Sequence, residues 1–279
     1  MNSIAKIQKK LVEKELDAIL ITDEKNQRYA TGFAFTDGAV IVAREKAWLL
    51  TDSRYIEAAE NTVDGCVTVQ MFDRQHSKLS LMTAALREAK VSRLGAEEQK
   101  LNHGEYLALE KELGMPLLPA QEILSSLRAA KCAEEIEFMR QAQRISEQAL
   151  EEVLHIIKPG MPEREVAAEL VYRMLRHGSE GNSFDPIVVT GTKTSLPHGV
   201  PGDKVIQAGD FVTMDFGCVY NGYCSDMTRT VAFGCITDEM KNVYETVLEA
   251  QLAAIDGKTG DEALFGLAAA YRRFAQEHK

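Results

Sequence analysis

Asp215 and Asp226 are the residues of this chain whose type and spacing best suggest chemistry. The two aspartates lie eleven residues apart, on either side of the dipeptide Asn221-Gly222. Asn-Gly is the strongest short signal for a β-hairpin, because both central residues of a type I′ turn need a positive φ. We therefore predict a hairpin that places the two carboxylates on neighbouring antiparallel strands.

The register of this hairpin follows from its turn. A two-residue loop at 221–222 places Asp215 opposite Thr228 and Asp226 opposite Gly217. Because positions 226 and 228 share a parity, both aspartates project from one face as diagonal neighbours, roughly 7–8 Å apart. Two carboxylates that converge can share a pair of divalent cations about 3.5–4 Å apart, as in hydrolytic two-metal sites.

The predicted face of the hairpin indicates a lined site. The face with the aspartates is polar, whereas the opposite face of the first strand is apolar. The polar face carries Thr213, Cys224, Thr228 and Thr230, and the apolar face carries Val212, Met214 and Phe216. We interpret Cys224 as a small filler, since dinuclear hydrolase sites favour hard oxygen donors. Spacing alone leaves open the alternative that both carboxylates are simply solvated.

His198 is the third candidate for a functional role. It lies in SLPHGVPGD (195–203), a loop rich in proline and glycine between two predicted strands, just ahead of the hairpin. Loops carry functional groups more often than cores do. We predict that the imidazole opens into the same cavity as the two carboxylates; the alternative is an ordinary surface histidine.

Composition and charge exclude some classes of partner. The chain has 279 residues, a formal net charge of −10 and five cysteines without CxxC spacing. Nucleic acids and anionic membranes both require a basic surface, so neither is an expected partner. No apolar run approaches the length of a membrane span, and the charged N-terminus is not a signal peptide. The odd number of cysteines suggests free thiols in a reducing cytoplasm.

The pattern of apolar residues predicts two domains. The N-terminal part alternates predicted helices and strands, which is typical of an α/β domain with helices covering a sheet. Apolar residues at helical spacing then predict a long helix over 133–158 and a second one over 162–177. From Ser183 onward the pattern changes to strands and turns. We place the N-terminal domain at 1–125 and the C-terminal domain at 132–279.

Eight segments of the chain resemble those of the proline-specific metallopeptidases with the pita-bread fold. This family includes aminopeptidase P, prolidase and their non-peptidase relative creatinase. The segments occur in family order and read NQRYATGF, LLTDSRY, LRAAKCAEEIEFMRQAQRIS, IKPGMPEREVAAEL, GSEGNSFDPIVVTG, LPHGVP, GDFVTMDFG and GYCSDMTRTVAFG. The resemblance implies an α/β creatinase-like N-terminal domain, which helps to form a homodimer, and an α+β pita-bread C-terminal domain.

The resemblance also implies site residues and a mechanism. Asp215 resembles the ligand of one metal ion, Asp226 the aspartate that bridges two ions, and His198 the histidine beside the scissile bond. The implied cofactors are two divalent ions, commonly manganese or cobalt, and the implied partners are proline-containing peptides. In the family, the ions acidify a bridging water, which attacks the carbonyl carbon of an Xaa-Pro bond.

The sequence departs from the family pattern after Gly257. The family's remaining three ligands, a histidine in a Gly/His-rich loop and two glutamates, have no match here. The tail over 258–279 is predicted to be an amphipathic helix, and Glu277 and His278 lack the motif context of ligands. We therefore expect a C-terminally shortened, incomplete pita-bread domain that is inactive as it stands.

Two alternatives to this peptidase lineage remain open from the sequence. One is a non-catalytic relative that acts as a dimerising or binding module. The other is creatinase-like amidine hydrolysis, which needs no metal; the two intact aspartates disfavour it.

Overall fold

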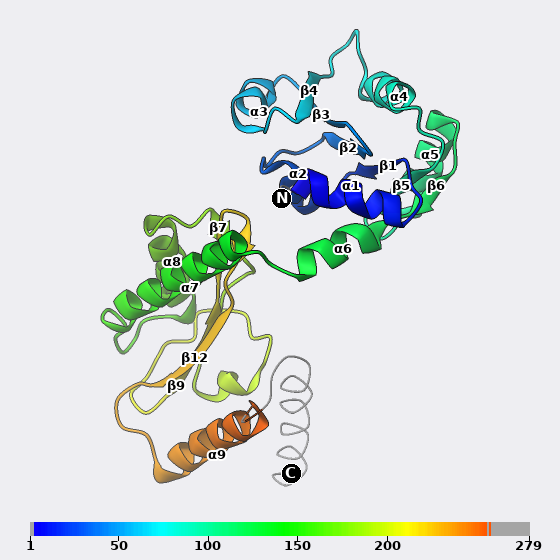
Figure 1. Ribbon diagram of the computed structural model, residues 1–279. Helices are drawn as coiled ribbons and strands as arrows, with labels where there is room; N and C mark the ends of the chain where they lie inside the picture. Colours follow the sequence, from blue (N-terminus) through cyan, green and yellow to red (C-terminus); the bar gives the residue numbers. More distant parts are fainter. Residues whose placement is uncertain (1–2, 256, 258–279) are drawn as a thin grey trace. The chain divides into compact units, whose positions relative to one another are not determined.

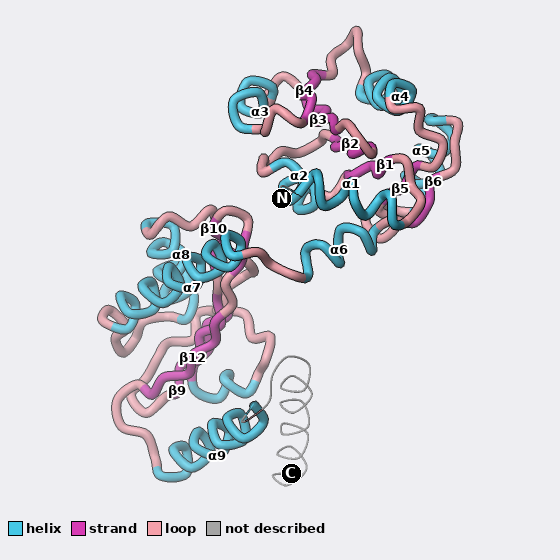
Figure 2. Tube along the Cα trace, in the orientation of Figure 1, coloured by secondary structure: helices cyan, strands magenta, loops and turns pink. Residues whose placement is uncertain are grey.

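The computed structural model describes residues 3–255 and 257, which belong to two compact units, Met1–Glu134 and Glu135–Lys279. Figures 1 and 2 show the elements of each unit, most of them labelled. The helix predicted over 258–279, with Glu277 and His278, lies outside the described residues. The first unit has one sheet and the second has two, and each unit has its own apolar core.

A six-stranded mixed sheet forms the centre of the first unit. Its strands follow the order β4-β3-β2-β1-β5-β6. They are β1 (Ala18–Ile21), β2 (Ala39–Ala43), β3 (Ala47–Thr51), β4 (Val67–Met71), β5 (Leu94–Ala96) and β6 (Leu117–Pro119). β2 pairs antiparallel with both of its neighbours, and the other pairs are parallel. The predicted α/β class of this domain is confirmed.

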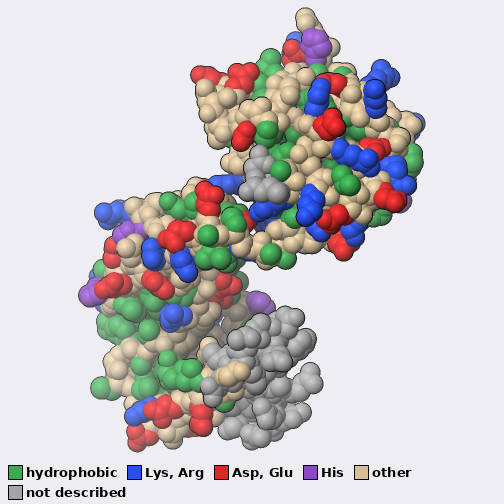
Figure 3. Space-filling model, in the orientation of Figure 1, with side chains coloured by type: hydrophobic (Ala, Val, Ile, Leu, Met, Phe, Trp, Pro, Cys, Tyr) green, Lys and Arg blue, Asp and Glu red, His purple; other side chains and the backbone are tan. Residues whose placement is uncertain are grey.

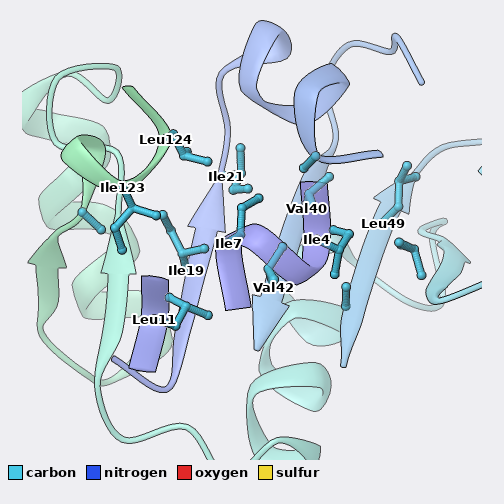
Figure 4. Close-up of a cluster of buried hydrophobic side chains, with 14 of the residues drawn as sticks. Ile4, Ile7, Leu11, Ile19, Ile21, Val40, Val42, Leu49, Ile123 and Leu124 are labelled. Carbon is cyan, nitrogen blue, oxygen red and sulfur yellow. The ribbon is translucent and has the colours of Figure 1, made fainter. Parts of the chain in front are cut away.

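Helices cover both faces of this sheet. Those of one face are α1 (Ser3–Glu13), α2 (Glu24–Thr31), α3 (Ile56–Thr62) and α6 (Gln121–Ala129), and those of the other are α4 (Lys78–Glu88) and α5 (His103–Leu113). In Figure 4, Ile4, Ile7 and Leu11 of α1 point toward the apolar side chains of β1 and β2. Burying each such side chain contributes about 1.5–3 kcal/mol, so α1 is held mainly by this stripe.

The second unit combines long helices with two small antiparallel sheets. The sheets have the strand orders β12-β9-β8 and β11-β10-β7. The elements are α7 (Ala133–Leu154), α8 (Glu163–Arg176), β7 (Gly181–Asn182), β8 (Ile187–Thr190), the short 3₁₀ helix η1 (Gly191–Ser195), β9 (Phe211–Phe216), β10 (Cys218–Tyr220), β11 (Tyr223–Cys224), β12 (Met227–Ala232) and α9 (Asp238–Ile255). This arrangement confirms the predicted α+β class.

The α7 and α8 helices cover one face of the β8-β9-β12 sheet. Burial alternates along β9, where Val212, Met214 and Phe216 are fully buried and the residues between them are partly exposed. The buried side chains pack against Ile145 of α7 and Leu170 of α8. One face of this sheet is therefore packed in the core. The other face carries Thr213 and Asp215 beside the apolar residues Ile187 and Val189 of β8.

Two helix predictions differ from the structure. The α7 helix ends at Leu154, four residues earlier than predicted, because the Ile156 and Ile157 amides both turn back to the Val153 carbonyl. The strand-and-turn prediction from Ser183 onward is wrong for α9. Its apolar residues Tyr244, Leu248 and Leu252 recur every four residues, which is helical spacing.

Charged side chains of both signs lie on the described surface of the chain. On the face drawn in Figure 3, acidic and basic side chains are interspersed over the described part of the chain. None of the helices within residues 3–255 combines the length and the apolarity that crossing a membrane requires.

Candidate functional site

The Asn221-Gly222 turn has the predicted geometry. Asn221 has φ 48° and Gly222 has φ 80°, as both central residues of a type I′ turn require. Tyr220 pairs with Tyr223 directly across the turn. The predicted hairpin and its two-residue loop are confirmed.

The register extends from the turn to the aspartates. Thr228 of β12 pairs with Asp215 of β9, as predicted. Asp226 immediately precedes β12, so it lies just outside the strand that was expected to contain it. Because the pairing on both sides of it keeps one register, Asp226 lies opposite Gly217. The prediction is therefore correct in register and wrong by one residue in the start of the strand.

The open face of the β9–β12 pair is a polar row that includes Asp215. The Thr228 hydroxyl donates a hydrogen bond to Asp215 Oδ1 at 2.8 Å. Further along the same face, the Thr213 and Thr230 hydroxyls lie 2.9 Å apart. Asp215 is half-buried and Asp226 is exposed. The predicted polar face therefore exists, and its carboxylates face away from the apolar core of the unit.

Gly217 brings two backbone segments into close contact beside Asp226. A Cβ atom at this position would lie 2.0 Å from the Ser225 carbonyl oxygen and 2.4 Å from Ser183 Oγ. Neither distance is possible for a real side chain, so glycine is required here by space rather than by φ. The close approach fixes the path of the chain immediately before Asp226.

Ser225 anchors the residue before Asp226 to the core. Its buried hydroxyl lies 2.7 Å from Ser146 Oγ on α7 and accepts a hydrogen bond of 2.9 Å from the Cys218 amide. Its carbonyl accepts a hydrogen bond of 2.8 Å from the Ser183 hydroxyl. The backbone on the N-terminal side of Asp226 is thus held on both sides.

Ser225→Ala is expected to lower the local free energy of unfolding of this sheet by about 1–3 kcal/mol, because it leaves the Ser146 hydroxyl and the Cys218 amide buried without their partner. Amide hydrogen exchange of β9 and β12 measures this loss. Thr230→Ala on the open face is the control and should cost less than about 1 kcal/mol. Equal effects of the two substitutions would contradict the anchoring role of Ser225.

His198 lies in a turn of the segment that joins β8 to β9, which we call the His198 loop (residues 191–210). The histidine is exposed, and no side-chain hydrogen bond of its imidazole is found among the described residues. The loop placement was predicted correctly. The opening of the imidazole into one cavity with the aspartates stays a prediction.

The base of the His198 loop is fixed by side chains that the sequence analysis did not single out. Asp210 accepts hydrogen bonds of 3.0 Å from the Thr190 hydroxyl and the Gln207 amide. Lys204 donates to the Thr190 carbonyl at 2.7 Å. Glu163, at the start of α8, also contacts the loop. Apart from the Gln207–Asp210 bond, these contacts join residues 14 or more positions apart, which a spacing pattern in the sequence does not predict.

The donor set was compared with the needs of a two-metal site. Carboxylate oxygens suit hard divalent cations, and Asp215 and Asp226 supply two such groups. Within residues 3–255 and 257, no group of three or more His, Cys, Asp or Glu side chains could hold a metal ion. The described residues therefore fit a metal pair only in part.

Both units match known sequence families. Residues 4–130 match the Creatinase/Prolidase N-terminal domain, and residues 137–279 match Metallopeptidase family M24. The chain is 38% identical over 253 residues to the Bacillus subtilis protein named uncharacterized peptidase YqhT. The aligned region covers 89% of this chain and 71% of that protein. It is 32% identical over 257 residues to the Xaa-Pro dipeptidase of Pyrococcus furiosus, covering 91% of this chain and 71% of that one.

Solved structures agree with these matches. The Xaa-Pro dipeptidase from Bacillus anthracis superposes with a TM-score of 0.84 at 36% identity, covering 92% of this chain and 72% of that chain. The prolidase from Pyrococcus horikoshii superposes with a TM-score of 0.86 at 30% identity, covering 98% of this chain and 78% of that chain. The similarity thus extends over both units and over roughly three quarters of each solved chain.

Proposed function

Because this chain belongs to metallopeptidase family M24, we propose that it carries part of a metal-dependent site that hydrolyses Xaa-Pro peptide bonds. The observation that carries the proposal is the hairpin of β9 and β12, whose register places Asp215 and Asp226 as diagonal neighbours beside a polar row. Similar proteins named Xaa-Pro dipeptidases support the choice of substrate class.

In this proposal the three residues have different roles. Asp215 and Asp226 are metal ligands, and His198 contacts the peptide beside the scissile bond. Divalent ions at such sites, for example manganese or cobalt, acidify a bound water and polarise a carbonyl group. The chain's own contribution is positional: the Thr228 hydroxyl orients the Asp215 carboxylate, and Ser225 fixes the backbone beside Asp226.

The comparisons favour this lineage over the two alternatives. The similar proteins reported above are named as peptidases, dipeptidases or a prolidase, and none of them as a creatinase or a binding module. We also propose that the protein is a homodimer and is located in the cytoplasm.

Manganese titration of the 279-residue chain tests the metal-ligand roles. We expect one weakly bound ion, measured by loss of the electron paramagnetic resonance signal of free Mn²⁺, because two carboxylates form an incomplete shell. Asp226→Asn and Asp215→Asn should each weaken binding about tenfold or more. The control is Asp203→Asn, which removes an exposed carboxylate paired with Arg164. Equal binding by all four proteins would contradict the assignment.

A further inference from the structure

Glu163 is a buried carboxylate that the proposed function does not use. It lies in the first turn of α8, and its side chain is 0% exposed. An acidic residue in the first turn of a helix is usually explained by the helix dipole, and exposed Glu165 in the same turn fits that explanation. Glu163 differs, because a buried carboxylate needs compensating donors close to it.

The donors to Glu163 come from the end of β8 and from the His198 loop. Oε1 accepts a hydrogen bond of 2.9 Å from the Thr190 amide. Oε2 accepts one of 3.1 Å from the Gly202 amide and forms an ion pair with Lys193. One carboxylate therefore holds the beginning of the His198 loop and the far side of the turn that contains His198.

Lys193 extends this clamp across the turn. Besides pairing with Glu163, its ammonium group donates to the Val200 carbonyl at 3.0 Å. The backbone of α8 adds two further bonds, since the Glu163 amide donates to the Lys204 carbonyl at 2.9 Å and the Arg164 amide to the Gly202 carbonyl at 3.2 Å. The free amides at the start of α8 are thus satisfied by the loop, which ties the helix and the loop together.

His198 depends on this backbone for its position. Its imidazole forms no hydrogen bond among the described residues, so the backbone determines where the side chain begins and no polar contact holds the ring itself. Between Lys193 and His198, the Leu196 amide donates to the Lys193 carbonyl at 2.9 Å. After His198, the Gly199 amide donates to the Leu196 carbonyl at 3.1 Å, and Gly199 packs closely against Val189. The turn is therefore bonded to the rest of the unit at both of its ends.

We propose that Glu163 is the positioning residue for His198: its carboxylate clamps residues 190–202 and thereby presents the imidazole to the peptide. The inference rests on the proposed function for the role of the imidazole, but the clamp itself is a property of this chain that can be measured without turnover. Buried polar groups specify a geometry more than they stabilise the fold in some proteins, and we assign the Glu163–Lys193 pair this role.

Hydrogen exchange and histidine NMR test the clamp, with Glu165→Gln as the matched control from the same helical turn. In Glu163→Gln, exchange of the amides between residues 192 and 202 should rise about tenfold or more, while that of β9 changes less than about twofold. The ring signal of His198, assigned with His198→Gln, should shift, and those of the other histidines should not. If the loop and His198 respond to Glu163→Gln no more than to Glu165→Gln, the proposal is wrong.

Lys193→Met covers the case in which Glu163→Gln does not fold. It leaves the hydrogen bonds from the Thr190 and Gly202 amides to Glu163 in place, and it removes both the ion pair with Glu163 and the link to Val200. Exchange of the hydrogen-bonded Leu196 and Gly199 amides should still rise several-fold, and unchanged exchange there would equally overturn the clamp.

Adding the dipeptide Ala-Pro separates this inference from the proposed function. The wild-type His198 signal should move with the peptide, and the Glu163→Gln signal should move less. If the wild-type signal does not move, the substrate role of His198 fails. The exchange data still test whether Glu163 holds residues 190–202 in place.

Discussion

The 279-residue chain, supplied with manganese, is expected to hydrolyse Ala-Pro at no more than about a thousandth of the rate of a version extended by a family-like segment that carries the histidine and two glutamates. In the proposed site, Asp215 and Asp226 alone would neither orient nor sufficiently acidify a bridging water. Release of free proline with and without the extension measures the difference.

Substitutions in the extended form assign the restored activity. Asp226→Ala should abolish it again, whereas Asp203→Ala, which removes an exposed carboxylate of the His198 loop, should leave it within about twofold of the parent. Robust metal-dependent turnover by the unextended chain would contradict the prediction. It would mean that other residues, or a partner subunit, complete the site.

Gly217→Ala is expected to destabilise the second unit by about 3 kcal/mol or more. The added methyl group would lie 2.0 Å from the Ser225 carbonyl oxygen, which belongs to the backbone and cannot turn away. The two strands must then separate at the point where Asp226 lies. Urea unfolding followed by circular dichroism, together with amide exchange of β9 and β12, measures the loss.

Two internal references make the Gly217 result specific. Gly202→Ala is the matched control, because its methyl group would meet the nearest atom at 3.8 Å, an ordinary contact. Trp48 is the only tryptophan of the chain and lies in the first unit, so its fluorescence should report an unchanged transition. A loss below about 1 kcal/mol would show that the strands separate easily and that Gly217 does not fix Asp226.

The hairpin shows how much of the site the sequence could predict. Asn221-Gly222 determines the turn, the turn determines the register, and the period of two assigns Asp215 to the polar face. These steps depend on neighbours in sequence. The roles of Gly217 and Ser225 depend instead on the distance between two backbone segments and on a hydroxyl group of α7, neither of which leaves a spacing pattern.

The α2 helix shows a similar limit for the fold. Its buried face includes the polar residues Asn26 and Gln27, so the apolar periodicity that predicts α1 is lacking here. The Asn26 amide group donates a hydrogen bond of 2.5 Å to Glu97, and its oxygen accepts one of 2.7 Å from Arg128. Polar contacts between segments distant in sequence therefore hold the buried face of this helix in place. The contacts of Glu163 with the His198 loop are of the same kind.

The most direct test of the account is the anomalous scattering of manganese in crystals of the extended protein. Two manganese peaks are expected about 3.5–4 Å apart, one bound by Asp215 and Asp226 and the other bound by Asp226, with His198 on the same side of the sheet. Manganese bound elsewhere, or two fully occupied ions that leave the Asp226 carboxylate uncoordinated, would contradict it.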